Sequence, residues 1–311
     1  VLVTGVTGHI GSRLAPLLVE SGHEVRVLVR ARSRLPDAPW ISSVEVVEGD
    51  IARGEGLGGA LNGVEAAYYL VHGMGAGVGF HERERQMSER FADAVKSAGI
   101  PRIIYLGALG DPESRLTEHL QSRHETGQRL AASGVDTVEL RAGPVVGAGS
   151  LPFEMIRYLT ERVPVMVCPR WVYTKVQPIA LRDVLSYLVA SLDVAVKGHQ
   201  VIEIGGSQIL SYGDMMTTYA HARGLRRLMI RVPVLTPRLS SYWVHLLTPL
   251  RSSFARLIVE GLRNEVVVRD RRAHELFPQI APLDYVSSVQ MALHELTPAE
   301  SAETRLTNEA A

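Results

Sequence analysis

The chain has 311 residues, with 33 Lys and Arg against 33 Asp and Glu, and 46% of its residues are hydrophobic. A chain of this length can bury about three-quarters of its extended surface, which is enough for one large domain or two modest ones. The zero net charge argues against a strongly basic nucleic-acid-binding surface, and the ordinary hydrophobic content excludes a chain that is disordered throughout.

Short strand-like segments and longer helix-like segments alternate through the first two hundred residues. Most of the strand candidates are apolar on both faces, as in a parallel sheet that helices cover on both sides. Helices are expected over residues 10–21 and 81–98, although Pro16 conflicts with the first of them. The expected strands cover residues 1–4, 25–30, 44–48, 66–72, 102–107, 137–141 and 201–205. The alternation predicts an α/β protein, a Rossmann doubly wound parallel sheet with ligands at the carboxyl ends of its strands.

The pattern changes after about residue 207. Prolines and an apolar patch around Tyr242 and Trp243 come first, and helices are then expected near residues 253–263, 270–277 and 284–295. We therefore expect two regions and a frayed tail. The expected boundaries are 1–145 plus 176–206 for the Rossmann domain, 146–175 plus 207–296 for a smaller, mostly helical C-terminal substrate or cap region, and 297–311 for the tail.

The sharpest motif is a run of three spaced glycines, Gly5, Gly8 and Gly11, between the first strand and the first helix. The first glycine allows a tight turn, the second lets the backbone approach a diphosphate, and the third lets the helix pack closely on the strand. Backbone N–H groups at the helix start would face the phosphates. The loop predicts a dinucleotide site that also includes Thr7, His9 and Ile10.

This loop resembles that of the short-chain dehydrogenase/reductase superfamily, in its extended and atypical branches. Three further motifs support the resemblance: Gly49-Asp50-Ile51, Leu140 to Gly147, and Gln177 to Val184. Specific matches cover about residues 1–206. The resemblance implies NAD(P)H binding, with Asp50 and Ile51 at the adenine and with Val71 and His72 lining the cofactor cleft.

Atypical members of that superfamily include NmrA-like redox sensors, isoflavone-reductase-like enzymes and the nucleotide-binding accessory subunit of respiratory complex I. The segment 122–127 also resembles a bacterial group of NAD(P)H-binding proteins, whose members often carry a further C-terminal domain. Extended members often pair through two helices, which correspond here to residues 81–98 and 119–133. A homodimer is therefore expected.

Arg30, at the end of the second expected strand, bears on the choice between NAD and NADP. An NAD site usually has Asp or Glu there, which holds the ribose hydroxyls and repels a 2′-phosphate. A guanidinium pairs with phosphate instead, and Arg32 and Arg34 follow it in the sequence. The sequence predicts NADP(H) in preference to NAD(H); a solvated basic loop is the competing interpretation.

The Tyr-x-x-x-Lys pair that most reductases of this superfamily use is absent. The chain has three lysines, and none follows a tyrosine at that spacing. The tyrosine position of the family falls on Leu120 and the lysine position on His124. As a neutral imidazole His124 would hydrogen-bond the cofactor ribose, and near its ordinary pKa of about 6.5 it would move a proton. His124 is therefore the candidate catalytic residue, and an exposed structural histidine is the alternative.

Other features are less specific. No metal is expected, because the eleven histidines lack a metal-binding spacing. The glycine-rich segment 73–79 would be a lid or a plain connector. Arg170 and Tyr173 would line an apolar pocket. The patch around Tyr242 and Trp243 is expected to be partly core, with contact to a membrane surface as the less favoured alternative.

The expected location is the cytoplasm. The single cysteine, Cys168, forms no intrachain disulfide and fits a reducing compartment. No apolar run reaches 18 residues, and no signal peptide is expected before the first strand.

The predicted function is an NADP(H)-dependent oxidoreductase with a small apolar, quinone- or enone-like substrate. Such acceptors take hydride at carbon or are protonated by water, so the tyrosine is less necessary. A non-catalytic NADP(H)-binding sensor or assembly protein is the alternative. A nucleotide-sugar epimerase or dehydratase ranks last because it needs the tyrosine. No nucleic-acid partner is expected.

Overall fold

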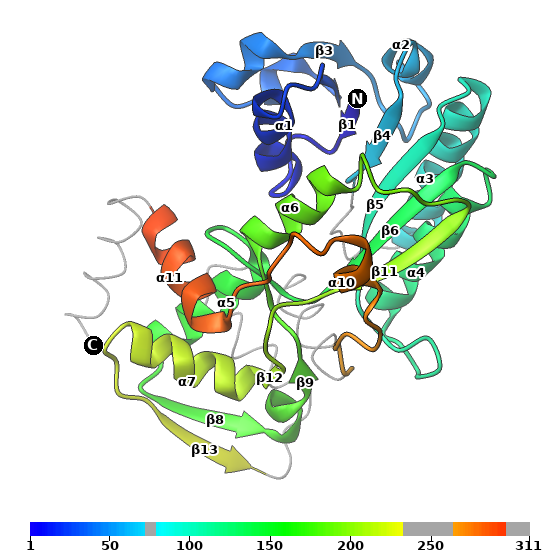
Figure 1. The fold of residues 1–311 in the computed structure, drawn as a ribbon. Helices are drawn as coiled ribbons and strands as arrows, with labels where there is room; N and C mark the ends of the chain where they lie inside the picture. The colour runs from blue at the N-terminus through cyan, green and yellow to red at the C-terminus, as the bar shows by residue number, and fades with distance from the viewer. Residues whose placement is uncertain (72–78, 233–263, 297–311) are drawn as a thin grey trace.

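The computed structural model describes residues 1–71, 79–232 and 264–296 (Figure 1). Its centre is a sheet of seven strands in the order β11-β6-β5-β4-β1-β2-β3, and every neighbouring pair is parallel. The strands are β1 (Leu2–Thr4), β2 (Arg26–Val29), β3 (Glu45–Glu48), β4 (Ala66–Tyr69), β5 (Arg102–Ala108), β6 (Asp136–Ala142) and β11 (His199–Ile204). The chain reverses its direction of winding between β1 and β4, which is where such a sheet opens a crevice for ligands. The predicted doubly wound sheet is confirmed.

Helices cover both faces of this sheet because successive side chains of each strand point to opposite sides. Val3 packs in a core shared with α1 and α6, whereas the adjacent Leu2 packs in a core shared with α2, α3 and α4. The covering helices are α1 (Gly11–Glu20), α2 (Leu57–Leu61), α3 (Phe80–Ser97), α4 (Glu118–Ala131) and α6 (Leu181–Ala190), and α10 (Arg272–Leu276) packs beside α6. Strands β1, β4, β5 and β6 are buried almost throughout, whereas the edge strand β3 has no buried residue.

Helix α1 continues through Pro16. Proline lacks the N–H that would bond one turn back, so the helix has one hydrogen bond fewer than its length would allow. Leu14, Ala15 and Leu18 are nonetheless buried. Their burial stabilises the helix against the loss, and the conflict noted in the sequence does not end it.

A second core lies beside the sheet and is built from α5 (Leu151–Arg162), α7 (Tyr212–Ala222) and α11 (Tyr285–Glu295), which lie together in Figure 1. Three short strand pairs accompany these helices: β7 (Val145–Val146) with β10 (Ile179–Ala180), β8 (Val165–Pro169) with β13 (Leu228–Val232), and β9 (Lys175–Val176) with β12 (Leu210–Ser211). The helices expected near 270–277 and 284–295 are present as α10 and α11. The helix expected near 253–263 and the tail 297–311 lie outside the described residues.

Three single turns of 3₁₀-helix complete the described chain: η1 (Arg32–Arg34), η2 (Pro39–Ser43) and η3 (Arg170–Tyr173). Across the described ranges, no helix is both long enough and apolar enough to pass through a membrane.

Candidate coenzyme site

A cavity of about 520 Å³ lies at the carboxyl ends of the strands around the β1–β4 reversal. The glycine loop forms one wall, and the ends of β2 and β3 form another. The predicted residues that line it are Gly5, Thr7, Gly8, His9, Ile10, Gly11, Arg30, Asp50, Ile51 and Val71. The fold therefore brings these ten predicted residues to one cavity. His72 lies outside the described residues.

The three glycines of the loop are required for different reasons. Gly5 has a φ of 71°, and a Cβ there would lie 2.5 Å from the carbonyl oxygen of Leu70. A Cβ on Gly11 would lie 2.4 Å from the carbonyl oxygen of Gly5. At Gly8 the nearest atom would be that same oxygen, at 3.1 Å. The fold itself therefore needs Gly5 and Gly11, whereas Gly8 chiefly keeps the approach to the loop open.

Two of the three arginines after β2 reach the cavity, Arg30 and Arg34. Arg32 is turned toward β3 instead: its backbone N–H donates to Oε1 of Glu48 at 2.6 Å, and its guanidinium donates to the carbonyl of Val46 at 3.5 Å. On the same side Asp50 accepts the backbone N–H of Ala52 at 2.9 Å, which fixes the turn after β3. The basic loop is thus divided between the cavity and the sheet.

Three lining residues come from helices and were not predicted: Arg83 and Met87 of α3 and Arg123 of α4. The guanidinium of Arg123 donates to the carbonyl of Leu106 at 2.9 Å and lies 5.6 Å from the ring centroid of Tyr105. Spacing along the chain offers no indication of them, because only the packing of α3 and α4 beside the sheet brings them to this crevice. Arg83 and Arg123 raise the number of arginines in the lining from two to four.

The charges of the lining fit a phosphorylated dinucleotide. Four arginines, Arg30, Arg34, Arg83 and Arg123, line the cavity together with one acidic residue, Asp50. Guanidinium groups pair with phosphate oxygens in bidentate geometry, and the N-terminal end of α1 adds backbone donors. A nicotinamide dinucleotide with its diphosphate therefore suits these residues.

The imidazole of His9, one of the lining residues, is held by Arg13. Arg13 donates from its guanidinium to Nδ1 and to the carbonyl of His9, both at 3.0 Å, and also to the carbonyl of Ala148 at 3.1 Å. Because Nδ1 accepts, the ring proton lies on Nε2, and that buried atom has no hydrogen-bond partner in the structure. Burial, and secondarily Arg13, lower the pKa of His9 to about 4. The imidazole of His9 is therefore neutral at pH 7, and its N–H is buried without a partner.

Acidification should destabilise the protein through His9. The pKa of His9 is about 4 in the folded protein and about 6.5 in the unfolded chain. Below pH 6.5 the unfolded chain therefore binds a proton that the folded protein does not, and the free energy of unfolding falls as the pH is lowered from 6.5 toward 4. Between about pH 7 and about pH 5, His9→Gln should lose about 1 kcal/mol less unfolding free energy than the parent protein, after allowance for solvent screening. Urea unfolding at both pH values measures the difference. An equal loss in the two proteins would contradict this explanation.

His124 lies on the buried face of α4, and its Nε2 lies 3.1 Å from the carbonyl oxygen of Ala108 at the end of β5. Burial first, and the nearby Arg141 second, lower the pKa of His124. The imidazole is therefore neutral at pH 7 and its Nε2–H donates to the backbone. His124 is not among the residues that line the cavity, although its neighbour Arg123 is.

The remaining candidates lie elsewhere. Arg170 and Tyr173 are on η3 beside the second core, where the guanidinium of Arg231 lies 4.2 Å from the ring centroid of Tyr173. Residues 72–78 of the glycine-rich segment and the patch around Tyr242 and Trp243 lie outside the described residues. Over the part of the chain that is described, no three His, Cys, Asp or Glu side chains gather as a metal site would need.

Comparison with known proteins agrees with the chemistry of this cavity. Residues 5–146 match the model of a family described as NAD(P)H-binding. A stretch of 115 residues is 34% identical to a 3-beta-hydroxysteroid dehydrogenase of Mycolicibacterium neoaurum, covering 34% of this chain and 31% of that protein. A second stretch, of 136 residues, is 30% identical to the (4-alkanoyl-5-oxo-2,5-dihydrofuran-3-yl)methyl phosphate reductase of Streptomyces griseus subsp. griseus. It covers 43% of this chain and 44% of that protein. The matches thus span less than half of either relative.

The fold has a relative over nearly its whole length. The triphenylmethane reductase of Citrobacter sp., complexed with NADP(H), superimposes with a TM-score of 0.74 at 16% sequence identity, over 94% of this chain and 99% of that one. At this identity the similarity establishes the fold alone. The family match gives a pyridine nucleotide as the coenzyme of this chain, and the glycine loop that lines the cavity is where its diphosphate is expected.

Proposed function

Because the chain is a member of the extended short-chain dehydrogenase/reductases, we propose that it is an NADP(H)-dependent oxidoreductase of an apolar, quinone- or enone-like substrate. The observation that supports NADP(H) over NAD(H) is the excess of arginines in the lining of the cavity, four against a single acidic residue. A 2′-phosphate adds negative charge at the end of β2, where Arg30 and Arg34 lie.

The bound coenzyme supplies or accepts a hydride, and the residues of this chain hold it in place. The glycine loop and the start of α1 bind the diphosphate, and the arginines fix the phosphorylated ribose. At the position where the family has its tyrosine, Leu120 is buried in the second core together with Leu109. This position therefore has no proton to donate, which favours acceptors that take hydride at carbon and obtain a proton from water.

The names of the two curated relatives give different substrates. One is a hydroxysteroid, which is an alcohol on a largely apolar skeleton, and the other is an unsaturated carbonyl compound that also carries a phosphate. Both relatives match over only part of their length, so neither gives the substrate of this chain. The first supports an apolar skeleton and the second an acceptor with a polarised double bond, and we propose that the substrate here combines these two features.

The sequence predicts that His124 hydrogen-bonds the cofactor ribose and moves a proton, but its Nε2 lies 3.1 Å from the carbonyl oxygen of Ala108 and it is not among the residues that line the cavity. Because its pKa is also lowered, we propose that His124 has a structural role, as a neutral donor to that carbonyl. His124→Gln can keep a donor to that carbonyl and should retain coenzyme affinity and turnover within about threefold, whereas His124→Ala should lose about 2 kcal/mol of stability. Calorimetric titration with NADP and urea unfolding measure the two effects. Loss of turnover in His124→Gln with intact binding would restore the proton-transfer role.

The function is tested by mixing the protein with NADPH and a panel of quinones, enones and ketones under anaerobic conditions. We expect oxidation of NADPH with quinones or enones and little with simple ketones. Gly8→Ala provides the matched control for turnover outside this site. Tight NADPH binding without turnover on any acceptor would instead support the sensor or assembly role.

A further inference from the structure

The strand pair β8–β13 has one buried face and one exposed face. Met166 and Cys168 point into the second core. The alternate residues Val165 and Val167 are 48% and 54% exposed, and on β13 Leu228 and Ile230 are 59% and 43% exposed. The register pairs Val165 with Leu228 and Val167 with Ile230. These four side chains therefore form one contiguous group, the aliphatic quartet.

The quartet is unusual for the solvent face of a strand pair. Strands with one covered face normally place polar residues on the other. Within the described residues six large hydrophobic side chains are exposed, and four of the six belong to the quartet. Exposed apolar side chains scattered singly need no explanation, but a contiguous group on one face indicates contact with an apolar environment.

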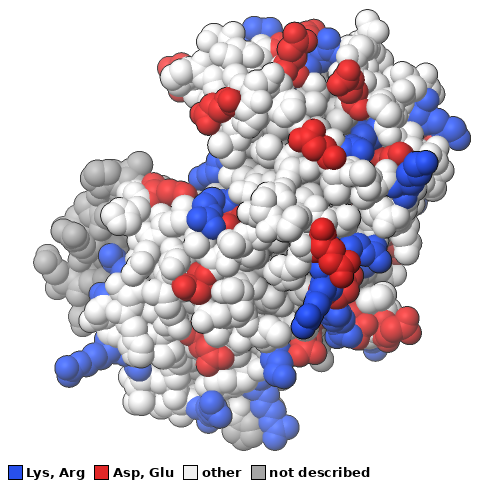
Figure 2. Space-filling view, viewed as in Figure 1, with Lys and Arg blue, Asp and Glu red and all other residues white. Residues whose placement is uncertain are grey.

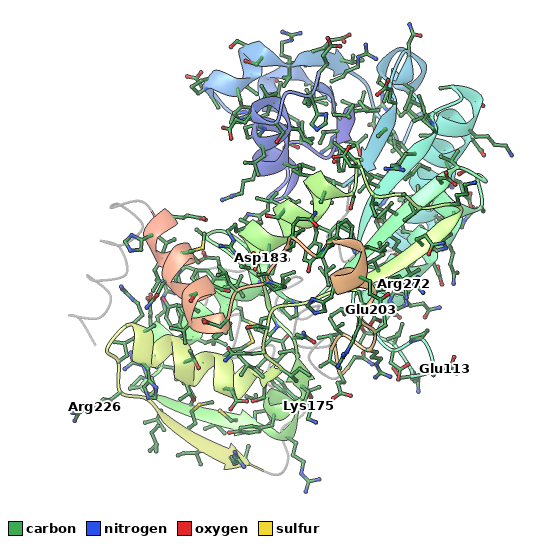
Figure 3. All side chains as sticks on the ribbon, in the orientation of Figure 1. Glu113, Lys175, Asp183, Glu203, Arg226 and Arg272 are labelled. Carbon is green, nitrogen blue, oxygen red and sulfur yellow. The ribbon has the colours of Figure 1, made fainter. Side chains whose placement is uncertain are left out.

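The chain around the quartet is rich in cations. Residues 162–175 and 223–232, which include both strands, contain no Asp or Glu. The buried Glu161 directly before them pairs with Arg223 at 3.2 Å, and the other exposed cations are Arg162, Arg170, Lys175, Arg226 and Arg231. In Figure 2 the lowest charged side chains, along the edge where Figure 1 places β8 and β13, are Lys or Arg. Figure 3 shows Arg226 beside the start of β13 and Lys175 near the other end of the pair.

We propose that this face docks on a lipid bilayer that contains anionic headgroups. The quartet would enter the boundary between headgroups and acyl chains, while the flanking cations contact the phosphates. A centre of aliphatic side chains with a rim of one charge matches such an interface. Protein interfaces, in contrast, concentrate their binding energy in Trp, Tyr and Arg at the centre. The inference does not depend on the proposed function.

Co-sedimentation with vesicles tests the proposal on the full chain, with phosphatidylglycerol mixed into phosphatidylcholine or with phosphatidylcholine alone. We expect binding to the anionic vesicles that weakens as salt is raised. The double variant Val167→Ser/Ile230→Ser should bind about tenfold more weakly, and Arg226→Gln about fivefold more weakly. No binding to anionic vesicles, or equal binding by the double variant, would overturn the proposal.

Val286→Ser is the matched control, because Val286 is 44% exposed on α11 and lies outside the quartet. It should bind vesicles as the parent protein does. Unchanged NADP binding by calorimetry shows that the double variant is folded, and it separates failure of this proposal from failure of the proposed function. Sedimentation equilibrium without lipid tests the alternative that a second copy of the chain occupies this face. If the parent protein is a dimer and the double variant is a monomer, the face is an interface between copies and the proposal is wrong.

Discussion

Gly8→Ala is expected to weaken NADP binding about 100-fold while the protein stays folded. The added methyl group would stand where the diphosphate approaches the loop, and it would displace the charge-assisted hydrogen bonds from the start of α1. Inside the protein the nearest atom to the new Cβ is the carbonyl oxygen of Gly5 at 3.1 Å, so a shift of a few tenths of an ångström accommodates it. Calorimetric titration with NADP and a thermal unfolding curve measure the two properties separately.

Gly11→Ala is the informative companion. Its Cβ would lie 2.4 Å from the carbonyl oxygen of Gly5 and 2.8 Å from Cα of Val6, both of them backbone atoms that cannot rotate away. We therefore expect it to lose about 2 kcal/mol or more of stability. A Gly8→Ala protein that binds NADP as tightly as the parent would show that the diphosphate does not lie against this loop.

Arg30→Glu should weaken NADP binding about 100-fold and leave NAD binding unchanged or stronger. The substitution removes a guanidinium that lines the cavity at the end of β2 and places there the carboxylate that repels a 2′-phosphate. A carboxylate at this position also accepts the ribose hydroxyls of NAD. Titrations with both nucleotides, at one salt concentration, measure the reversal of preference.

Arg32→Glu is the matched control for that experiment. It makes the same change of charge two residues away, but Arg32 is turned toward Glu48 and Val46 on β3. Its effect on NADP binding should stay below about threefold at physiological salt, where exposed charges are screened. Equal effects of the two variants would mean that general charge, and not a contact from Arg30, sets the preference.

The sequence predicted the sheet because short strand-like segments alternate with segments of helix length. Strands β1, β4, β5 and β6 are buried almost throughout, although the runs 102–107 and 137–141 also contain the charged residues Arg102, Glu139 and Arg141. The glycine loop was predictable because its geometry restricts the residue type. The positive φ of Gly5 and the close backbone contacts at Gly5 and Gly11 leave little room for any side chain, so the loop leaves a recognisable spacing of glycines in the sequence. The end of β4 was less predictable: the apolar run continues to Val71, but the ladder with β5 stops at Tyr69.

The helical side of the cavity was not predictable from the chain alone. Met87 fits the apolar stripe of α3. The sequence does not distinguish residues of this stripe that face the core from residues that face the cavity. Arg123 and His124 are adjacent, and the resemblance to the family pointed to His124. The packing of α4 instead directs Arg123 to the cavity and engages His124 at the carbonyl of Ala108. The strand pairs of two to five residues are too short to leave a periodic pattern.

An edge strand of the central sheet comes from a part of the chain that lies outside the family match. Strand β11 closes the edge of the sheet by pairing with β6 from Thr137 to Ala142, yet it comes from residues 199–204, well after the family match ends at 146. A fragment cut at that boundary would keep the whole glycine loop and leave β6 with a bare hydrogen-bonding edge. Bare edges recruit strands from other molecules, so such a fragment should precipitate although its nucleotide-binding residues are all present.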